Sequence, residues 1–435
     1  MRLLYNIGIR LYLCITGIVG LFNPKAKLFH AGQKGLLKRI KAEVGHTSLP
    51  IIWVHCSSVG EFEQARLIIE WYKKGGHKYK ILLTFFSPSG YELRKNYEFA
   101  DWVYYLPIDT SSNAKAFVEA VRPAKAIFIK YEFWYNYLRE LKRNNIETYI
   151  VAAIFRPTQQ FFKWYGSFFR KMLECYTRFF VQDKQSAELL QSVGFSENVM
   201  ICGDTRFDRV YEITHNSKTF PVIEQFAAGS SLTFVAGSSW EPDEEIIEGA
   251  MKHFNNMKLI IAPHEIGKER IASIEQRFSG YKVVKFSSFK SALSGAGEND
   301  AQGALSEMAM RAVKEADVLI IDCIGILSSI YRYGKFAYIG GGFGVGIHNI
   351  LEAATYGCPV VFGPNHKKFK EAADLLKLGG ATSVKNVTEL YSLFKVYKTA
   401  PRELQQKGEI CSKYVESNLG ATQKIVSVIE NLSNS

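Results

Sequence analysis

This sequence contains no paired cysteines and no closely spaced pair of aspartates. Its seven cysteines lie far apart, their number is odd and no Cys-x-x-Cys pair occurs, so neither a disulfide framework nor a zinc site is predicted. An Asp-x-Asp pair, which would suit Mg²⁺ and phosphate oxygens, is also missing, and we expect no metal and no cofactor. The sequence has no RNA-binding signature, zinc finger or basic zipper either, so nucleic acid is not a predicted partner.

What the chain does have is length, apolar residues and positive charge. It has 435 residues, of which 47% are hydrophobic and 22% charged, and its formal net charge is +12. A single hydrophobic core rarely grows beyond about 250–300 residues, so two domains are expected. The excess of lysine and arginine favours anionic partners, such as phosphorylated substrates or an acidic membrane surface.

The N-terminal segment, residues 1–22, is apolar and aromatic but contains Asn6 and Arg10. Its uninterrupted part, residues 11–22, is too short to span about 30 Å of hydrocarbon, whereas residues 3–22 would span it if Arg10 were accommodated. Basic residues follow between positions 25 and 41 and should stay cytoplasmic. We expect a membrane anchor or interfacial helix within residues 1–30, with a plain packing helix as the alternative.

From residue 50 onward, short β-branched runs alternate with amphipathic stretches, which is typical of doubly wound parallel sheets. Strands are predicted at residues 51–55, 80–85, 102–107, 126–130, 148–153, 178–182, 232–239, 258–263, 281–286, 318–323, 336–341 and 359–364. The pattern blurs over residues 210–230. We therefore predict two α/β domains, at residues 31–215 and 230–412, joined near residues 215–230, and a C-terminal helix at 413–435. Residues 288–306 are polar and rich in Gly, Ser and Ala, and are predicted to form a loop.

Five glycines occur between Gly340 and Gly346, directly after a predicted strand. Their spacing is not Gly-x-Gly-x-x-Gly and no acidic residue ends the next strand, so a dinucleotide fingerprint is not favoured. Glycines let backbone approach a ligand closely. A helix starting near Asn349 would turn its N–H groups toward a phosphate. Glu352 follows three residues later, and it would either contact the ligand or close a capping box with Asn349.

The first domain has a parallel feature in HCSSVGEFEQA, residues 55–65. A predicted strand ends at His55, and Ser58 with Glu61 again fits a capping box. The structural interpretation of Glu61 is therefore a capping carboxylate. The functional interpretation is a carboxylate at the carboxyl edge of the sheet, where ligands of open α/β sheets bind and where it would act as a general base.

An ordered set of motifs resembles the 3-deoxy-D-manno-octulosonic acid (Kdo) transferases, and it extends over almost the whole chain. In order, the motifs are HCSSVGE (55–61), TFFSPSG (84–90), YLPID (105–109), EFWYN (132–136), GDTRFD (203–208), AGSS (236–239), APHE (262–265), DCIGIL (322–327), GGGFGVGIHNILEAA (340–354) and FGPNHKKFKEA (362–372). One such motif would be weak evidence, but the ordered set is strong.

The resemblance implies a GT-B fold, in which two Rossmann-like domains face each other across a cleft. It implies an inverting glycosyltransferase that moves Kdo from CMP-Kdo to a lipid A precursor in lipopolysaccharide biosynthesis. The first domain would bind the acceptor and the second CMP-Kdo. The enzyme would act at the cytoplasmic face of the inner membrane, so its expected partners are the donor, the acceptor glycolipid and the membrane surface.

The resemblance also implies the roles of individual residues. The expected catalytic residues are Glu61 as the base, with Arg206, Lys130 and Glu132. The expected CMP-binding residues are Ser238, Ser239, Pro263, His264, Ile324, Gly325, Ile326, Gly346, Asn349, Ile350, Leu351 and Glu352. The expected acceptor-binding residues are Ser58, Gly60 and Arg156.

Four of these positions depart from the pattern of the family. Lys130 stands where the family commonly has a second Glu, His264 replaces the basic residue of a Pro-Arg pair, Ile326 replaces an acidic residue and Arg206 replaces a Lys. The last change keeps the charge but not the hydrogen-bond geometry. These departures alter the expected charge balance of the site and leave the expected fold unchanged.

Several alternatives remain open from the sequence. Glu132 would act in the site, anchor a cation, or fix Trp134 and Asn136, and Arg156 would either face the acceptor or pack. Another GT-B nucleotide-sugar transferase or epimerase is the nearest alternative function. A non-catalytic glycolipid binder is a different class, and the complete HCSSVGE segment argues against it, because a binder needs no base.

Overall fold

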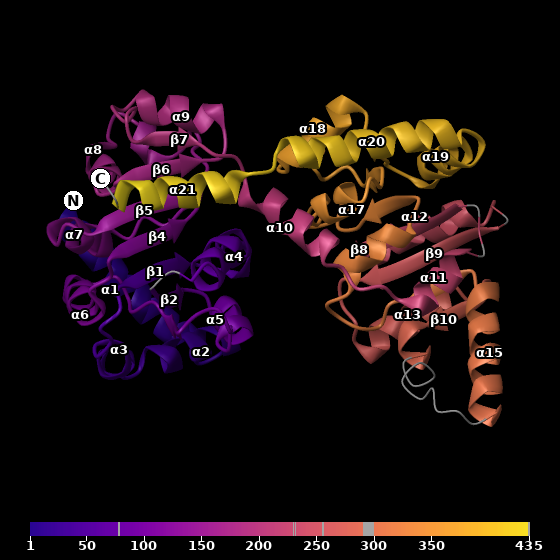
Figure 1. The fold of residues 1–435 in the computed structure, drawn as a ribbon, viewed down its shortest axis with the longest axis horizontal. Helices are drawn as coiled ribbons and strands as arrows, with labels where there is room; N and C mark the ends of the chain where they lie inside the picture. The colour runs from indigo at the N-terminus through magenta and orange to yellow at the C-terminus, as the bar shows by residue number, and fades with distance from the viewer. Residues whose placement is uncertain (77–78, 229, 231, 255, 290–299, 434–435) are drawn as a thin grey trace. The chain divides into compact units, whose positions relative to one another are not determined.

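The computed structural model describes residues 1–76, 79–228, 230, 232–254, 256–289 and 300–433. The chain forms two compact units: the first comprises Met1–Arg209 with Leu419–Ser435, and the second comprises Val210–Asn418. Figure 1 shows a parallel sheet with flanking helices in each unit. Apolar strand runs alternate with helices along the chain, as the sequence predicts.

The sheet of the first unit has seven parallel strands in the order β3-β2-β1-β4-β5-β6-β7. Their bounds are β1 (Ile51–Cys56), β2 (Lys80–Phe85), β3 (Trp102–Tyr105), β4 (Lys125–Ile129), β5 (Glu147–Ala153), β6 (Arg178–Val181) and β7 (Val199–Ile201). All six residues of β1 are buried, because helices cover both faces of the sheet.

Alternating side chains of these strands enter two different cores. Trp53 of β1 belongs to one core with α3, α6 and α7, whereas Val54 belongs to the other with α4 and α21. The helices of this unit are α1 (Arg2–Val19), α2 (Pro24–Gln33), α3 (Leu36–Val44), α4 (Val59–Lys74), α5 (Pro88–Arg94), α6 (Ser111–Val121), α7 (Tyr135–Arg143), the 3₁₀-helix η1 (Gln160–Phe162), α8 (Ser167–Leu173), α9 (Lys184–Gln191), α10 (Thr205–His215), which continues into the second unit, and α21 (Ala421–Ser433).

The C-terminal helix α21 packs on the first unit, although most of its sequence neighbours lie in the second. Ile425, Val426 and Ile429 are fully buried in the core shared with α4. Glu430 accepts hydrogen bonds from the hydroxyl of Tyr72 (2.8 Å) and from the ammonium of the buried Lys125 (3.2 Å). The chain therefore crosses back to complete the first hydrophobic core.

The sheet of the second unit also has seven parallel strands, in the order β10-β11-β9-β8-β12-β13-β14. Their bounds are β8 (Leu232–Ser239), β9 (Met257–Pro263), β10 (Val283–Lys285), β11 (Val318–Ile320), β12 (Phe336–Ile339), β13 (Val360–Phe362) and β14 (Ala381–Ser383). The helices are α11 (Pro221–Ala228), α12 (Glu241–Met251), α13 (Lys268–Arg277), η2 (Phe286–Phe289), α15 (Asp300–Glu315), α16 (Leu327–Ile330), η3 (Tyr331–Tyr333), α17 (Leu351–Thr355), α18 (Lys370–Leu378), α19 (Val387–Thr399) and α20 (Pro401–Ser417).

The predicted loop at residues 288–306 is only partly tested. Residues 290–299 lie outside the described residues. Residues 288–289 belong to η2 and residues 300–306 to α15, so the loop prediction is wrong at both ends. Alanine and glutamate favour helix, and α11 packs against α15. The small residues that suggested a loop are therefore compatible with a packed helix.

Helix α1 lies against the first unit along one side. Tyr5, Ile9 and Leu13 pack on its core, and the Tyr5 hydroxyl donates a hydrogen bond to the buried carboxylate of Asp109 at 2.6 Å. The spacing of four residues places these side chains on one face of the helix. The large apolar residues exposed elsewhere on α1 are Leu3, Leu4, Ile7, Leu11, Tyr12, Ile15, Ile18 and Val19.

By length and composition, α1 is apolar enough to cross a membrane, and among the described residues it is the one helix that is. The predicted N-terminal apolar helix is therefore present.

Candidate active site

In the first unit, strand order reverses between β1 and β4, and ligands of doubly wound sheets bind outside the carboxyl ends of strands at such a point. His55 on β1 and Glu132 just after β4 meet here: His55 Nε2 lies 3.3 Å from Glu132 Oε2. Both residues are buried. His55 was quoted in the motif but not assigned a role, and only the pairing of β1 with β4 shows its contact with Glu132.

Glu132 is held by several groups. The indole Nε1 of Trp134 donates to its carboxylate at 2.6 Å, and the Tyr176 hydroxyl donates to its backbone carbonyl. Burial alone would raise the pKa of Glu132, but the charge of His55 and the hydrogen bonds from His55, Ser57 and Trp134 outweigh burial and hold the pKa below its ordinary value. The carboxylate thus fixes Trp134, as one sequence alternative expected.

Asn136, which the same sequence alternative expected Glu132 to fix, contacts Asp109 instead. Its side-chain amide donates to the backbone carbonyl of Asp109 at 2.6 Å, and its backbone N–H donates to the Asp109 carboxylate at 3.1 Å. Glu132 therefore positions Trp134, whereas Asp109 positions Asn136.

Glu61 lies in the first turn of α4, five residues after β1 ends. The expected capping box is wrong, because Ser58 caps no backbone N–H group. The Ser58 hydroxyl donates instead to the carboxylate of Glu61. Glu61 is partly exposed and Gly60 is exposed, and the nearest atom to a Cβ at Gly60 would be the Ser58 hydroxyl, at 3.7 Å. The glycine thus leaves open space beside a carboxylate that a hydroxyl already orients.

Glu61 and Glu132 lie on the same edge of this sheet. Burial raises the pKa of the Cys56 thiol, and the charges of Glu132 and Glu61 raise it further. Both carboxylates therefore act electrostatically on one buried residue at the end of β1. The structure brings together these two predicted catalytic residues within the first unit.

Arg206 lies in the first turn of α10, beside α4. The Thr205 hydroxyl donates to the backbone carbonyl of Gln64 at 2.8 Å, which fixes the start of α10 on α4. Both the Nε and a terminal nitrogen of Arg206 contact the Asp204 carboxylate, at 2.8 and 2.7 Å. A carboxylate that sequence reasoning did not select therefore orients this guanidinium, whose side chain is about one-third exposed.

Lys130 directly follows β4 and has a φ of 72°, a left-handed conformation that is uncommon outside glycine. Its backbone N–H donates to the Val151 carbonyl at 2.9 Å. Two predicted site residues affect the pKa of the next residue, Tyr131. Burial raises this pKa, the charge of Arg156 lowers it and the charge of Glu61 raises it. Arg156 is exposed and thus lies within electrostatic range of the same residue as Glu61.

In the second unit, the strand order reverses between β8 and β12. The predicted donor residues lie at the carboxyl ends of four adjacent strands. Ser238 and Ser239 end β8, Pro263 ends β9 and His264 follows it, Ile324–Ile326 follow β11, and Gly346–Glu352 follow β12. Because parallel strands end at the same edge, the topology gathers all of these residues. Ile324 is 82% exposed, whereas Ile350 and Leu351 are buried, so the last two contribute to the core.

The glycine stretch packs mainly against the protein itself. A Cβ at Gly340 would lie 2.2 Å from the Ser238 carbonyl oxygen, and one at Gly342 would lie 2.5 Å from the Gly363 nitrogen. These two glycines let the loop cross the ends of β8 and β13. By contrast, nothing lies within 4 Å of a Cβ at Gly344. The sequence predicted that these glycines let the backbone approach a ligand. At Gly340 and Gly342 that explanation is wrong, because neighbouring backbone occupies the space that a side chain would fill.

The helix after the glycines is shorter than the sequence suggests. Helix α17 has five residues and begins at Leu351. Asn349 accepts a hydrogen bond from the Leu351 N–H at 3.1 Å and donates its amide to Glu352 at 3.0 Å. No capping box forms, and the dipole of so short a helix is small. Any anion here would depend on side chains more than on a helix terminus.

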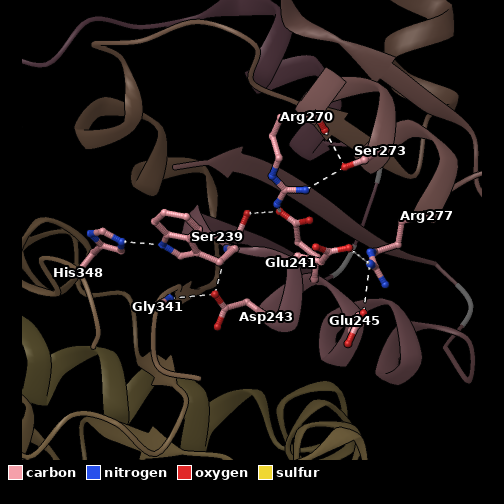
Figure 2. Close-up of polar contacts among 11 residues, drawn as sticks. Ser239, Glu241, Asp243, Glu245, Arg270, Ser273, Arg277, Gly341 and His348 are labelled. Atoms are coloured by element: carbon pink, nitrogen blue, oxygen red, sulfur yellow. Dashed lines mark hydrogen bonds and ion pairs between the residues drawn. The ribbon is translucent and has the colours of Figure 1, made fainter. Parts of the chain in front are cut away.

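A buried carboxylate supports the end of β8. Glu244 is fully buried, accepts a hydrogen bond from the Ser239 hydroxyl at 2.8 Å and contacts an Arg270 terminal nitrogen at 2.5 Å. Asp243 accepts hydrogen bonds from the backbone N–H groups of Gly341 (2.8 Å) and Trp240 (3.0 Å). Figure 2 shows these contacts from α12 to the glycine loop and to α13. Sequence reasoning missed both carboxylates, although each follows the predicted strand within five residues.

Three aromatic rings meet at the same edge. The Trp240 indole Nε1 donates to His348 Nε2 at 3.1 Å (Figure 2). The ring of His264 stacks on both, with centroids 4.6 Å from Trp240 and 4.5 Å from His348. A cavity of about 150 Å³ lies beside Trp240 and is lined by Pro242, Asp243, Phe343, Gly344 and Val345. Of these three rings, the sequence predicted a role for His264 alone.

The described residues contain no group of three or more His, Cys, Asp and Glu side chains that could hold a metal ion.

Comparison with known proteins shows which family the sequence of the first unit matches. Residues 31–209 match the family described as 3-deoxy-D-manno-octulosonic-acid transferase (kdotransferase). This match covers most of the first unit. A 3-deoxy-D-manno-octulosonic acid transferase of Aquifex aeolicus is 28% identical over 376 residues, covering 84% of this chain and 92% of the relative. A transferase of the same name from Chlamydophila psittaci is 25% identical over 370 residues, covering 83% of this chain and 80% of the relative.

These relatives confirm the resemblance inferred from the motifs and the predicted enzyme class, a glycosyltransferase. Solved structures confirm the fold class. A UDP-GlcNAc 2-epimerase from Neisseria meningitidis superimposes with a TM-score of 0.59 at 14% identity, covering 88% of this chain and all of that one. Acinetobacter baumannii MurG gives 0.51 at 12% identity, covering 88% and 99%. The fold is therefore two doubly wound parallel α/β domains of the GT-B type.

Proposed function

We propose that this Kdo transferase family member moves Kdo from CMP-Kdo to a lipid A precursor, with inversion at the anomeric carbon. The observation that carries the proposal is the match to the Kdo transferase family over residues 31–209, together with relatives of that name over most of the chain. The net charge of +12 suits a phosphorylated acceptor and an anionic donor.

Glu61 is the proposed general base, taking the proton of the acceptor hydroxyl as that oxygen attacks. The carboxylate lies at the switch point of the first sheet, is partly exposed, and accepts a hydrogen bond from Ser58, which orients it. General-base catalysis requires such a carboxylate within hydrogen-bond reach of the proton. Ser58, Gly60 and Arg156 would bind the acceptor around it.

Arg206 and Lys130 would offset the negative charge of the Kdo carboxylate and the leaving phosphate. Asp204 contacts the Arg206 guanidinium and orients it, and a planar guanidinium suits carboxylate and phosphate oxygens. Preorganised donors aimed at developing charge are worth about 3–4 kcal/mol each where they have been measured. Glu132 would act through Trp134 and His55, which it contacts.

The second unit would bind CMP at the carboxyl edge of its sheet. Ser238 and Ser239 end β8 at the switch point, Pro263 ends the adjacent strand β9 and His264 follows it, and the backbone of Ile324, Gly325 and Ile326 follows β11. Gly346 and the segment from Asn349 to Glu352 follow β12, with Asn349 and Glu352 already hydrogen-bonded to each other. The Glu352 carboxylate would contact a ribose hydroxyl.

We propose that α1 lies on the cytoplasmic face of the inner membrane rather than spanning the bilayer. One face of this helix is occupied by the first unit, through Tyr5, Ile9 and Leu13. A spanning helix would need lipid or other membrane segments around its whole circumference. The opposite face exposes Leu4, Ile7 and Leu11 at helical spacing, which suits an interfacial helix, and the basic residues between positions 25 and 41 favour anionic lipid.

Transfer assays with purified protein test the function. We expect product formation from CMP-Kdo and a tetraacylated lipid A precursor, with a mass increase of one or more Kdo units, and none from UDP-sugars. Transfer from a UDP-sugar in place of CMP-Kdo would favour the alternative, another GT-B enzyme. Stoichiometric binding of CMP-Kdo without turnover would instead favour a glycolipid or nucleotide binder.

The base assignment is tested with Glu61→Gln against Glu63→Gln in the same turn. Glu63 pairs with Arg94 at 2.9 Å, and a surface ion pair contributes about 0–1 kcal/mol, so its variant should fold and keep most activity. Glu61→Gln should fold but lose transfer by about 100-fold or more. Equal activity of the two variants would contradict the assignment.

The membrane proposal is tested by flotation with vesicles containing anionic lipid. Replacing Leu4, Ile7 and Leu11 by serine should abolish flotation but leave the protein folded, because these side chains are exposed. Replacing three exposed lysines of α2 and α3 by serine should weaken flotation in a salt-dependent way. Undiminished binding of the α1 variant would exclude this helix as the anchor.

A further inference from the structure

The three stacked rings at the edge of the second sheet come from three different segments. Trp240 precedes α12, His264 follows β9, and His348 follows the glycine stretch. The hydrogen bond between Trp240 Nε1 and His348 Nε2 joins these two rings edge to edge. His264 stacks on both at interplanar angles of 25°, and it is an exposed residue. The arrangement is a small aromatic platform that carries one exposed imidazole.

Hydrogen bonding decides which histidine carries charge. An indole N–H donates and never accepts, so His348 Nε2 must be an unprotonated acceptor in this arrangement. Burial lowers the pKa of His348, and the neighbouring His264 lowers it further. Two imidazolium rings with centroids 4.5 Å apart would also repel each other. The pair therefore carries at most one positive charge, and the hydrogen bond from Trp240 excludes His348 Nε2 as the site of the added proton.

The acidic groups on the segments that carry the three rings already have hydrogen-bond or ion-pair partners, apart from Glu265. From the β8–α12 segment, Asp243 accepts two backbone N–H groups and Glu244 pairs with Arg270 of α13. From the β12–α17 segment, Glu352 is bound by Asn349. Glu265 is next to His264 in the chain and is exposed. Trp240 presents a π-face to His264, which stabilises a cation there.

We propose that His264, Trp240 and His348 form a proton-coupled phosphate site: the donor phosphate binds at His264, and this imidazole takes up a proton from solvent as the anion binds. Trp240 and His348 are positioning residues, since the first supports the cation and the second stays neutral. The inference rests on the proposed donor and deepens it, because binding of the phosphate, but not of the nucleoside, becomes dependent on pH.

The test is calorimetric binding of CMP and of cytidine to the full-length protein between about pH 7 and pH 8.5. The second phosphate ionisation, near pH 6, is then complete. For CMP we expect affinity to fall as pH rises, by up to about tenfold per pH unit, with net proton uptake in buffers of different ionisation enthalpy. Cytidine binding should be weak and flat over this range.

Three variants separate the roles. His264→Gln should remove the pH dependence and most of the advantage of CMP over cytidine. His264→Arg should bind CMP with no pH dependence, because a guanidinium stays charged. His348→Leu removes the acceptor of the Trp240 indole, so Trp240 would support the cation on His264 less well and the fall in CMP affinity should shift to lower pH. A purely structural role for His348 would weaken binding without moving that profile.

The outcomes distinguish this inference from the proposed donor. CMP binding that is flat across the range, or a pH profile unchanged in His264→Gln, would overturn the proton-coupled site and leave the donor proposal standing. UMP binding as tightly as CMP, with the same profile, would support the site and contradict the cytidine donor. Absence of binding by either nucleotide at every pH would overturn both.

Discussion

Asp109 connects α1 to the first unit, and its ionisation makes the stability of that unit depend on pH. Its carboxylate is 1% exposed and accepts hydrogen bonds from the Tyr5 hydroxyl at 2.6 Å and from the backbone N–H groups of Asn136 and Tyr137 at 3.1 and 3.0 Å. Burial raises the pKa of Asp109 from 3.8 to about 6, because the loss of water outweighs these three donors.

The sign of the effect follows from this difference. Since the carboxyl pKa is higher in the folded than in the unfolded protein, the folded state binds the proton more tightly. The free energy of unfolding therefore falls as pH rises through about 4 to 6 and is flat above that range. Two pKa units correspond to about 3 kcal/mol in total, of which about 2 kcal/mol are lost between about pH 4.5 and pH 7.5.

Urea unfolding measures this loss. Five of the six tryptophans lie in the first unit, so the fluorescence transition reports mainly on it. Asp109→Asn cannot titrate, and its stability relative to wild type should therefore improve by about 2 kcal/mol between about pH 4.5 and pH 7.5. Its absolute stability should be lower throughout, because an amide N–H₂ would face a donor.

Tyr5→Phe provides the control for the contact with α1. The Tyr5 hydroxyl lowers the pKa of Asp109, so its removal should raise that pKa and move the loss of stability to higher pH. Parallel stability profiles for wild type and Asp109→Asn would refute the reasoning, since they would show that Asp109 does not titrate with a raised pKa.

Two further substitutions test the packing of each unit. Gly342→Ala should lower the free energy of unfolding by about 1–3 kcal/mol in thermal unfolding, because its Cβ would lie 2.5 Å from the Gly363 nitrogen. Gly344→Ala is the control and should be near neutral, because nothing lies within 4 Å of its Cβ. Equal effects of the two substitutions would contradict the packing argument. Ile429→Ala should destabilise the first unit by about 2–5 kcal/mol, because this side chain is fully buried beneath α21. The exposed Gln423→Ala on the same helix is its control, and a loss below about 1 kcal/mol for Ile429→Ala would show that α21 contributes little to that core.

The sequence determined the fold class and the family through local signals. Both sheets consist largely of short apolar runs separated by amphipathic stretches, and that period is visible without any tertiary contact. Strands β7 and β14 were not predicted. The residues of β14 are Ala-Thr-Ser rather than an apolar run, and β7 is a short edge strand in which no residue is fully buried. The motifs around Glu61 and His264 were readable for a similar reason: each is a continuous segment at the end of a strand.

Tertiary structure decided what each of those residues touches. Ser58 was expected to cap a helix and instead binds Glu61, since the two side chains compete with the backbone for the same hydrogen bonds. Gly340 and Gly342 are required because backbone at the ends of β8 and β13, which the loop crosses, leaves no room for a Cβ. The platform under His264 joins three segments spread over more than one hundred residues. Local periodicity specifies elements, whereas contacts between strand ends depend on strand order, which no single segment encodes.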